Sequence, residues 1–114
     1  MSVYRILQED ASMEELIEET KRIAAERFGT FGFAQAQIEQ LLVSGERDIR
    51  KEAAQLQQLL SEETADPERI NQSLHALKGL FLNMGNDTLA EKLSDLRHDD
   101  NHEEKITVLR NLFK

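Results

Sequence analysis

Apolar residues recur every three or four positions along most of the chain, which is the spacing of one face of an α-helix. No stretch alternates apolar and polar residues over the length of a strand. The positions between the apolar residues are rich in Glu, Gln, Ala, Lys and Arg, all of which favour helix. The pattern predicts five helices, over residues 12–28, 33–61 and 66–84, and from near residues 87 and 101.

Several predicted helix ends carry residues that suit them. Asp66 can accept hydrogen bonds from the free amides of a first turn, and Pro67 at the next position loses an N–H that had no partner. The same helix is expected to reach about Met84 and to end at Gly85. Two candidate capping boxes pair Ser12 with Glu15 and Asn101 with Glu104.

The second predicted helix contains Gly45, which costs about 1 kcal/mol relative to alanine inside a helix. A break into two shorter helices at this glycine is the alternative to one long helix. We favour one helix because the apolar stripe keeps its phase across the glycine, through Ile38, Leu42, Ile49, Ala53, Leu56 and Leu60.

The connections between the last four predicted helices are short, which favours antiparallel neighbours. The expected fold is therefore all-α, an up-down antiparallel four-helix bundle with an additional N-terminal helix. We expect residues 1–114 to form one domain, with the bundle core over about 33–113. The N-terminal helix, over about 12–28, would pack across the bundle or cap one end.

Charge and composition exclude several partners. The net charge of −8 disfavours binding to nucleic acids and to anionic membrane surfaces. Cysteine is absent, so there is no disulfide, thiolate metal site or cysteine nucleophile. No apolar run approaches the ~20 residues needed to cross a bilayer, and the first residues lack the apolar stretch of a secretory signal. We expect a cytoplasmic protein that acts as a monomer.

The third predicted helix separates its apolar residues from a candidate reactive group. At about 100° per residue, one stripe collects Ile70, Leu74, Leu77, Phe81 and Met84 and should face the core. His75 lies well off this stripe. Together with Asn71, Lys78 and Leu82 it forms one outer row, which we call the His75 ridge.

The residues of this ridge are more typical of a reactive site than of an ordinary solvated helix surface. A neutral imidazole is a competent nucleophile at cellular pH, and Lys78 can hold its ammonium near an anion on the ring. Gly79 weakens a good helix where no kink or cap is needed, yet it lets another molecule come close to His75. Leu82 is a large apolar residue where a polar one would be cheaper.

The segment Ser73-Leu74-His75-Ala76-Leu77-Lys78-Gly79 resembles the His-x-x-Lys-Gly signature of histidine-containing phosphotransfer (HPt) domains. The resemblance extends downstream through Asn83, Gly85, Leu89 and Leu96, so it covers about Asp66 to Leu96. The residues after the glycine depart from the family, which has small residues where this chain has Leu80, Phe81 and Leu82. Of these three, only Leu82 alters the predicted docking face, so the departure bears on partner identity.

The resemblance implies a four-helix bundle whose histidine accepts a phosphoryl group from an aspartyl phosphate on a receiver domain and passes it to another receiver. His75 would be the acceptor, and Lys78 would steady the phosphate charge. Gly79 would leave room for the partner, while Leu82 and Ala76 would belong to the docking surface. Partners would be the receiver domains of response regulators or hybrid histidine kinases.

The chain is not expected to be an autonomous enzyme or to hold a cofactor. It lacks a Gly-x-x-x-x-Gly-Lys loop for ATP and a carboxylate cluster beside His75, so Mg²⁺ and most catalytic groups would come from the receiver. Asn71 and Gln72 are further candidates to contact the partner or to orient the imidazole or phosphate.

The sequence also allows other interpretations. His98 and His102 are four residues apart, but the Asp-Asp-Asn between them reads as a loop and helix start, so no metal site is expected. The main rival function is a non-catalytic helical adaptor with the same fold, for which Leu82 alone would mark a protein interface. A dimerising fragment of a histidine kinase, which would need an ATP-binding domain after the bundle, is a weaker third class.

Overall fold

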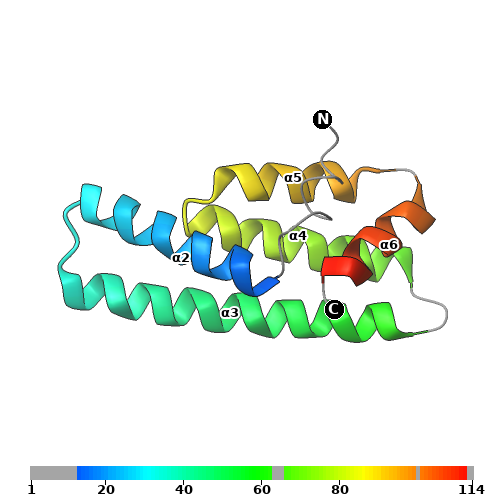
Figure 1. Cartoon of the computed structure of the whole chain (residues 1–114), viewed down its shortest axis with the longest axis horizontal. Helices are drawn as coiled ribbons and strands as arrows, with labels where there is room; N and C mark the ends of the chain where they lie inside the picture. The colour runs from blue at the N-terminus through cyan, green and yellow to red at the C-terminus, as the bar shows by residue number, and fades with distance from the viewer. Residues whose placement is uncertain (1–12, 63–65, 100, 113–114) are drawn as a thin grey trace.

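The part of the chain that the structure describes is built from helices. The structure is a computed structural model, and it describes residues 13–62, 66–99 and 101–112. The helices follow in the order α2 (Met13–Thr30), α3 (Gln35–Ser61), α4 (Pro67–Asn83), α5 (Asp87–Arg97) and α6 (His102–Leu112) (Figure 1). The five predicted helices are thus confirmed, with the boundaries shifted by two residues or fewer. The candidate cap Ser12 and Phe113, at the end of the predicted bundle, lie outside the described residues.

Helix α3 is the longest of the described helices, and it runs along one edge of the structure in Figure 1. Helices α2 and α4 pack against α3, and α5 packs against α4. The short α6 packs against the C-terminal end of α3. We expected the first helix to cross the bundle or cap one end, but α2 lies lengthwise along α3. The reason is that Ile17 and Ala24, two turns apart, are both buried against the other helices.

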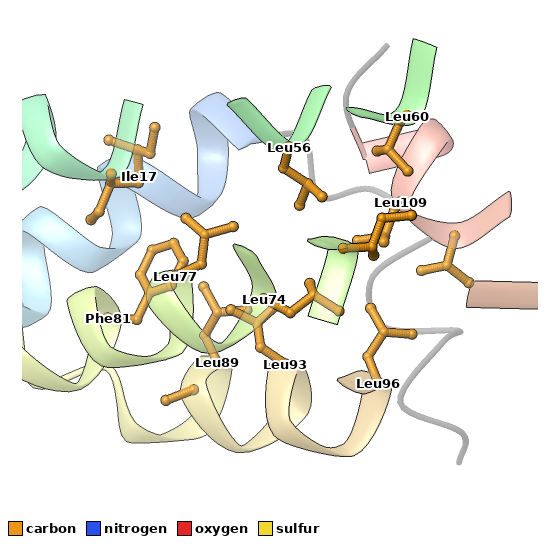
Figure 2. Close-up of a cluster of buried hydrophobic side chains, with 14 of the residues drawn as sticks. Ile17, Leu56, Leu60, Leu74, Leu77, Phe81, Leu89, Leu93, Leu96 and Leu109 are labelled. Carbon is orange, nitrogen blue, oxygen red and sulfur yellow. The ribbon is translucent and has the colours of Figure 1, made fainter. Parts of the chain in front are cut away.

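One apolar core joins all of the described helices (Figure 2). Helix α4 lies at its centre, and every residue of its predicted stripe is buried: Ile70, Leu74, Leu77, Phe81 and Met84. Helix α5 contributes Leu89, Leu93 and Leu96. Burial of side chains of this size stabilises the fold by roughly 1.5–3 kcal/mol each, so the core sets the rotation of each helix about its axis.

Helix α3 runs without interruption through Gly45, as the phase of its apolar stripe predicted. The structure adds a reason for the glycine. A Cβ atom at position 45 would overlap the Sδ atom of Met84, which is buried at the end of α4. The glycine therefore leaves room for a side chain from another helix, and the methionine fills the gap in the core.

Helix α4 begins and ends where the sequence predicted. Asp66 is the N-cap, its Oδ1 atom accepts a hydrogen bond from the Glu68 amide at 3.0 Å, and Pro67 begins the helix. At the other end Gly85 has a φ of +86°, its amide donates to the Leu82 carbonyl, and the Asn86 amide donates to the Phe81 carbonyl. This pair of bonds is a Schellman motif, and it fixes where the helix stops.

Asn86 then links this stop to the rest of the fold. Its Oδ1 atom accepts from the Leu89 amide and so caps α5. Its Nδ2 atom donates to Thr20 Oγ1 at 2.8 Å, and both side chains are buried. Helices α2, α4 and α5 are therefore tied together by one satisfied polar contact inside the core.

None of the helices in the described ranges is long and apolar enough to cross a membrane.

We predict that the effect of Gly45→Ala depends on Met84. In most helix interiors alanine is about 1 kcal/mol more favourable than glycine, but here the new methyl group overlaps the Met84 thioether and that gain is lost. In a Met84→Ala background the space is vacant, and Gly45→Ala should stabilise by about 1 kcal/mol. Urea unfolding of the four variants measures this coupling. An equal effect of Gly45→Ala in both backgrounds would contradict the proposed packing.

Candidate functional site

The His75 ridge lies on the outside of α4, as the helical periodicity predicted. The side chain of His75 is exposed, and that of Leu82 retains 44% of its accessible surface. Asn71 and Lys78 are half-buried, because they lie on the part of the ridge nearer the core. The imidazole therefore faces solvent beside one exposed apolar residue and between two half-buried polar residues.

The neighbours of His75 along the chain hold it in this orientation. Leu74 is 0% exposed and Leu77 is 1% exposed, so both sit fully inside the core. On the side toward α3, buried Ser73 donates a hydrogen bond from Oγ to Glu52 Oε1 at 2.9 Å. Turning α4 enough to bury His75 would expose two leucines and break this bond. The packing of α4 therefore keeps the side chain of His75 on the surface.

Charge on this part of α4 is limited to one cation. Residues 70–86 contain no Asp or Glu, although the chain as a whole carries a net charge of −8. Lys78, three residues after His75, is the charged side chain of this segment, and its Nζ forms no ion pair or hydrogen bond with the described residues. An anionic group on His75 would therefore meet a positive charge and no carboxylate from its own helix segment.

Gly79 lies on the same outer face, and the packing of the described residues does not require a glycine there. A Cβ atom at this position would meet nothing within 4 Å, and the residue lies inside α4 with a negative φ. Its helical cost of about 1 kcal/mol relative to alanine is not explained by any internal contact. What the glycine leaves is open space beside His75, bordered by the small side chain of Ala76.

Asn71 is less free than we expected. Its Oδ1 atom accepts a hydrogen bond from Lys105 Nζ at 2.9 Å, so the amide is engaged with α6 and its oxygen does not face solvent. Lys105 is only 4% exposed, and its Nζ also donates to the Arg97 carbonyl at 3.1 Å. Sequence reasoning missed Lys105. A signal was present, because it precedes buried Val108 and Leu109 by three and four residues and so occupies a core-facing position.

Gln72 faces a different region from Asn71. It is exposed and borders a polar groove of about 310 Å³ between α3 and α4, on the side where Ser73 meets Glu52. Asn71 and Gln72 are adjacent in sequence, but Asn71 faces α6 and Gln72 faces α3.

The two other histidines lie at the junction of α5 and α6. His98 is the C-cap residue of α5, and His102 is the first residue of α6, so separate elements orient them as predicted. Within the described ranges, no group of three or more His, Asp or Glu side chains is close enough to hold a metal ion.

Comparison with known proteins gives no match: no protein-family model, no curated protein and no solved structure is significantly similar to this chain.

We predict that Gly79→Ala stabilises the protein while Gly85→Ala destabilises it. Alanine at position 79 gains about 1 kcal/mol of helix stability and meets no neighbour, which corresponds to a rise in Tm of about 4 °C. Alanine at position 85 would be held at positive φ and would overlap Arg27, so this variant is the matched control with the opposite sign. Thermal unfolding measures both. A loss of stability in Gly79→Ala would mean that the glycine has a structural role.

Proposed function

We propose that this protein is a phosphohistidine carrier of the HPt type. His75 would accept a phosphoryl group from an aspartyl phosphate on a receiver domain and pass it to the aspartate of another receiver. The observation that carries this proposal is the arrangement on α4. An exposed histidine stands three residues before a lysine that has no ion pair to any described residue, and beside an open glycine, on a segment without carboxylates. The same residues form the His-x-x-Lys-Gly pattern.

The chemistry is a direct displacement at phosphorus. The lone pair of one imidazole nitrogen forms the N–P bond, while the P–O bond of the acyl phosphate breaks and the aspartate leaves as a carboxylate with that electron pair. The other ring nitrogen keeps its proton, so no proton is transferred and the total charge is unchanged. Transfer to the next receiver is the reverse of this step.

Little catalytic apparatus is required of the carrier in such a reaction. Phosphoryl transfer depends chiefly on positioning and on stabilising the charge of the equatorial oxygens. Lys78 supplies one positive charge from the carrier, and the receiver would supply Mg²⁺ and the remaining groups. The protein is therefore proposed to be a substrate and carrier in the relay, and it holds no cofactor of its own in this proposal.

The docking surface proposed for the receiver is the outer face of α4. Leu82 offers apolar area at one end, while Gly79 and Ala76 keep the surface low beside His75. Contact at this face leaves the buried side of α4 untouched, so binding requires no opening of the core. The proposed partners are receiver domains of response regulators or hybrid histidine kinases, in the cytoplasm.

The finer architecture belongs to the same proposal. We propose an up-down antiparallel four-helix bundle, in which the carrier acts as a monomer. The packing of α3 on α4, of α4 on α5 and of α6 on α3 supports a bundle made of the last four helices, with α2 as the additional N-terminal helix that lies on α3.

We predict that His75→Gln abolishes phosphoryl acceptance and leaves the fold intact, because the side chain is exposed. The measurement is transfer of radiolabel from a panel of phosphorylated receivers, together with thermal unfolding of each variant. His98→Gln, at another exposed histidine, is the matched control and should accept label normally. The label should be released by acid and survive alkali, as expected of an N–P bond. Label on His75→Gln would overturn the assignment, and receiver binding without any labelling of the wild type would favour the adaptor.

We predict that Gly79→Ala and Lys78→Ala slow transfer in ways that depend differently on the donor. The methyl group at position 79 obstructs a protein partner, so acceptance from a receiver falls about tenfold while acceptance from phosphoramidate, a small donor, is unchanged. Loss of the lysine removes a charge-assisted contact and slows both reactions about tenfold. If Gly79→Ala slowed acceptance from the receiver and from phosphoramidate equally, the glycine would not act by leaving room for a protein partner. Unchanged transfer by Lys78→Ala would contradict the charge role.

A further inference from the structure

We propose that the Asn71 side-chain amide donates a hydrogen bond to the phosphoryl group on His75, and that buried Lys105 holds the amide in the orientation this requires. The proposal rests on the proposed function of His75. It assigns a direct contact to Asn71 and a positioning role to Lys105, which belongs to a different helix.

The orientation of the Asn71 amide follows from the chemistry of its neighbour. A lysine ammonium carries three donors and no acceptor, so the atom of Asn71 that faces it at 2.9 Å must be the oxygen. The Lys105 ammonium is itself held in place, because it donates to the Arg97 carbonyl at 3.1 Å and its side chain is 4% exposed. Rotation of the amide by half a turn would bring its NH₂ group against the ammonium, which is unfavourable.

The amide NH₂ group is then free to serve the His75 ridge. The Nδ2 atom carries two N–H groups, and neither donates a hydrogen bond to a described residue. Asn71 precedes His75 by four residues, so the two side chains are neighbours on the helix surface. Helical side chains lean toward the N-terminus, so the imidazole extends over the turn that contains Asn71. A phosphoryl group on that ring comes within reach of the amide donors.

The two polar residues of the ridge would then act on the phosphoryl group from opposite sides. Lys78 follows His75 by three residues and brings charge, whereas Asn71 precedes it by four and brings directed neutral donors. Because the oxygen of Asn71 is held by a buried cation, the amide is polarised and its N–H groups become better donors. Lys105 thus influences the phosphoryl group without touching it.

Four variants test this arrangement. Asn71→Asp keeps an oxygen for Lys105 but has no N–H donor, and Asn71→Ala removes the donor without adding charge. Lys105→Met keeps the apolar stem and loses the ammonium, while Lys105→Arg restores donors in the same place. The readouts are the rate of acceptance from phosphoramidate, the hydrolysis rate of the phosphohistidine, and the ¹⁵N–¹H signals of the Asn71 side-chain amide before and after phosphorylation.

Asn71→Asp and Asn71→Ala should both slow acceptance about tenfold, since each removes a hydrogen bond to a charged group. In the wild type and in Lys105→Arg the Asn71 amide signals should shift when His75 is phosphorylated, whereas in Lys105→Met that shift should be lost. A merely structural role of Lys105 would leave the shift in place.

Several results would overturn the inference. If Asn71→Asp slows acceptance and Asn71→Ala does not, the added negative charge explains the effect and the donor role is wrong. If the amide signals of the wild type do not move on phosphorylation, the contact does not exist. If Lys105→Met does not fold, the two Asn71 variants and Lys105→Arg still test the proposed contact. Normal acceptance by every variant would overturn this inference alone, whereas a wild type that accepts no phosphoryl group would overturn the proposed function as well.

Discussion

The buried apolar stripe of α4 sets how this helix lies among its neighbours. The stripe is held between α3 and α5, and its members are almost completely removed from water: Ile70, Leu74, Leu77 and Phe81. At roughly 1.5–3 kcal/mol for each side chain, this burial is large compared with the total stability of a domain of this size. It leaves α4 one rotational position, and in that position His75 faces solvent.

A polar residue on the outside of such a helix is held in position by the packing of its neighbours, although its own side chain is not packed. His75 is exposed, yet its position is set by its buried neighbours Leu74 and Leu77 and by the bond from Ser73 to Glu52. The surface around it is shaped by what is missing, namely a side chain at Gly79 and carboxylates between residues 70 and 86. A carrier that offers its histidine to large partners would need these properties, because the partner must approach closely and bring the catalytic groups.

Much of this arrangement could be predicted from the sequence, because it depends on local rules. Helical periodicity placed the apolar stripe and His75 on different faces, and Asp66, Pro67 and Gly85 marked the ends of α4. The contacts that could not be predicted join residues far apart in the chain. Met84 against Gly45 and Lys105 on Asn71 are both of this kind, and so is the lengthwise packing of α2 on α3. A lysine at a core-facing position of α6 was a visible signal, but its partner could not be identified before the helices were placed.

If His75 carries a phosphoryl group between receivers, as we propose, the group should leave the labelled protein when a receiver is added. The labelled protein would be purified away from its donor and mixed with an unphosphorylated receiver. Label should disappear from His75 and appear on the receiver's aspartate, and a receiver whose acceptor aspartate is replaced by asparagine should receive none. Label that stays on the carrier in the presence of every receiver tested, or a histidine that never becomes labelled, would contradict the claim.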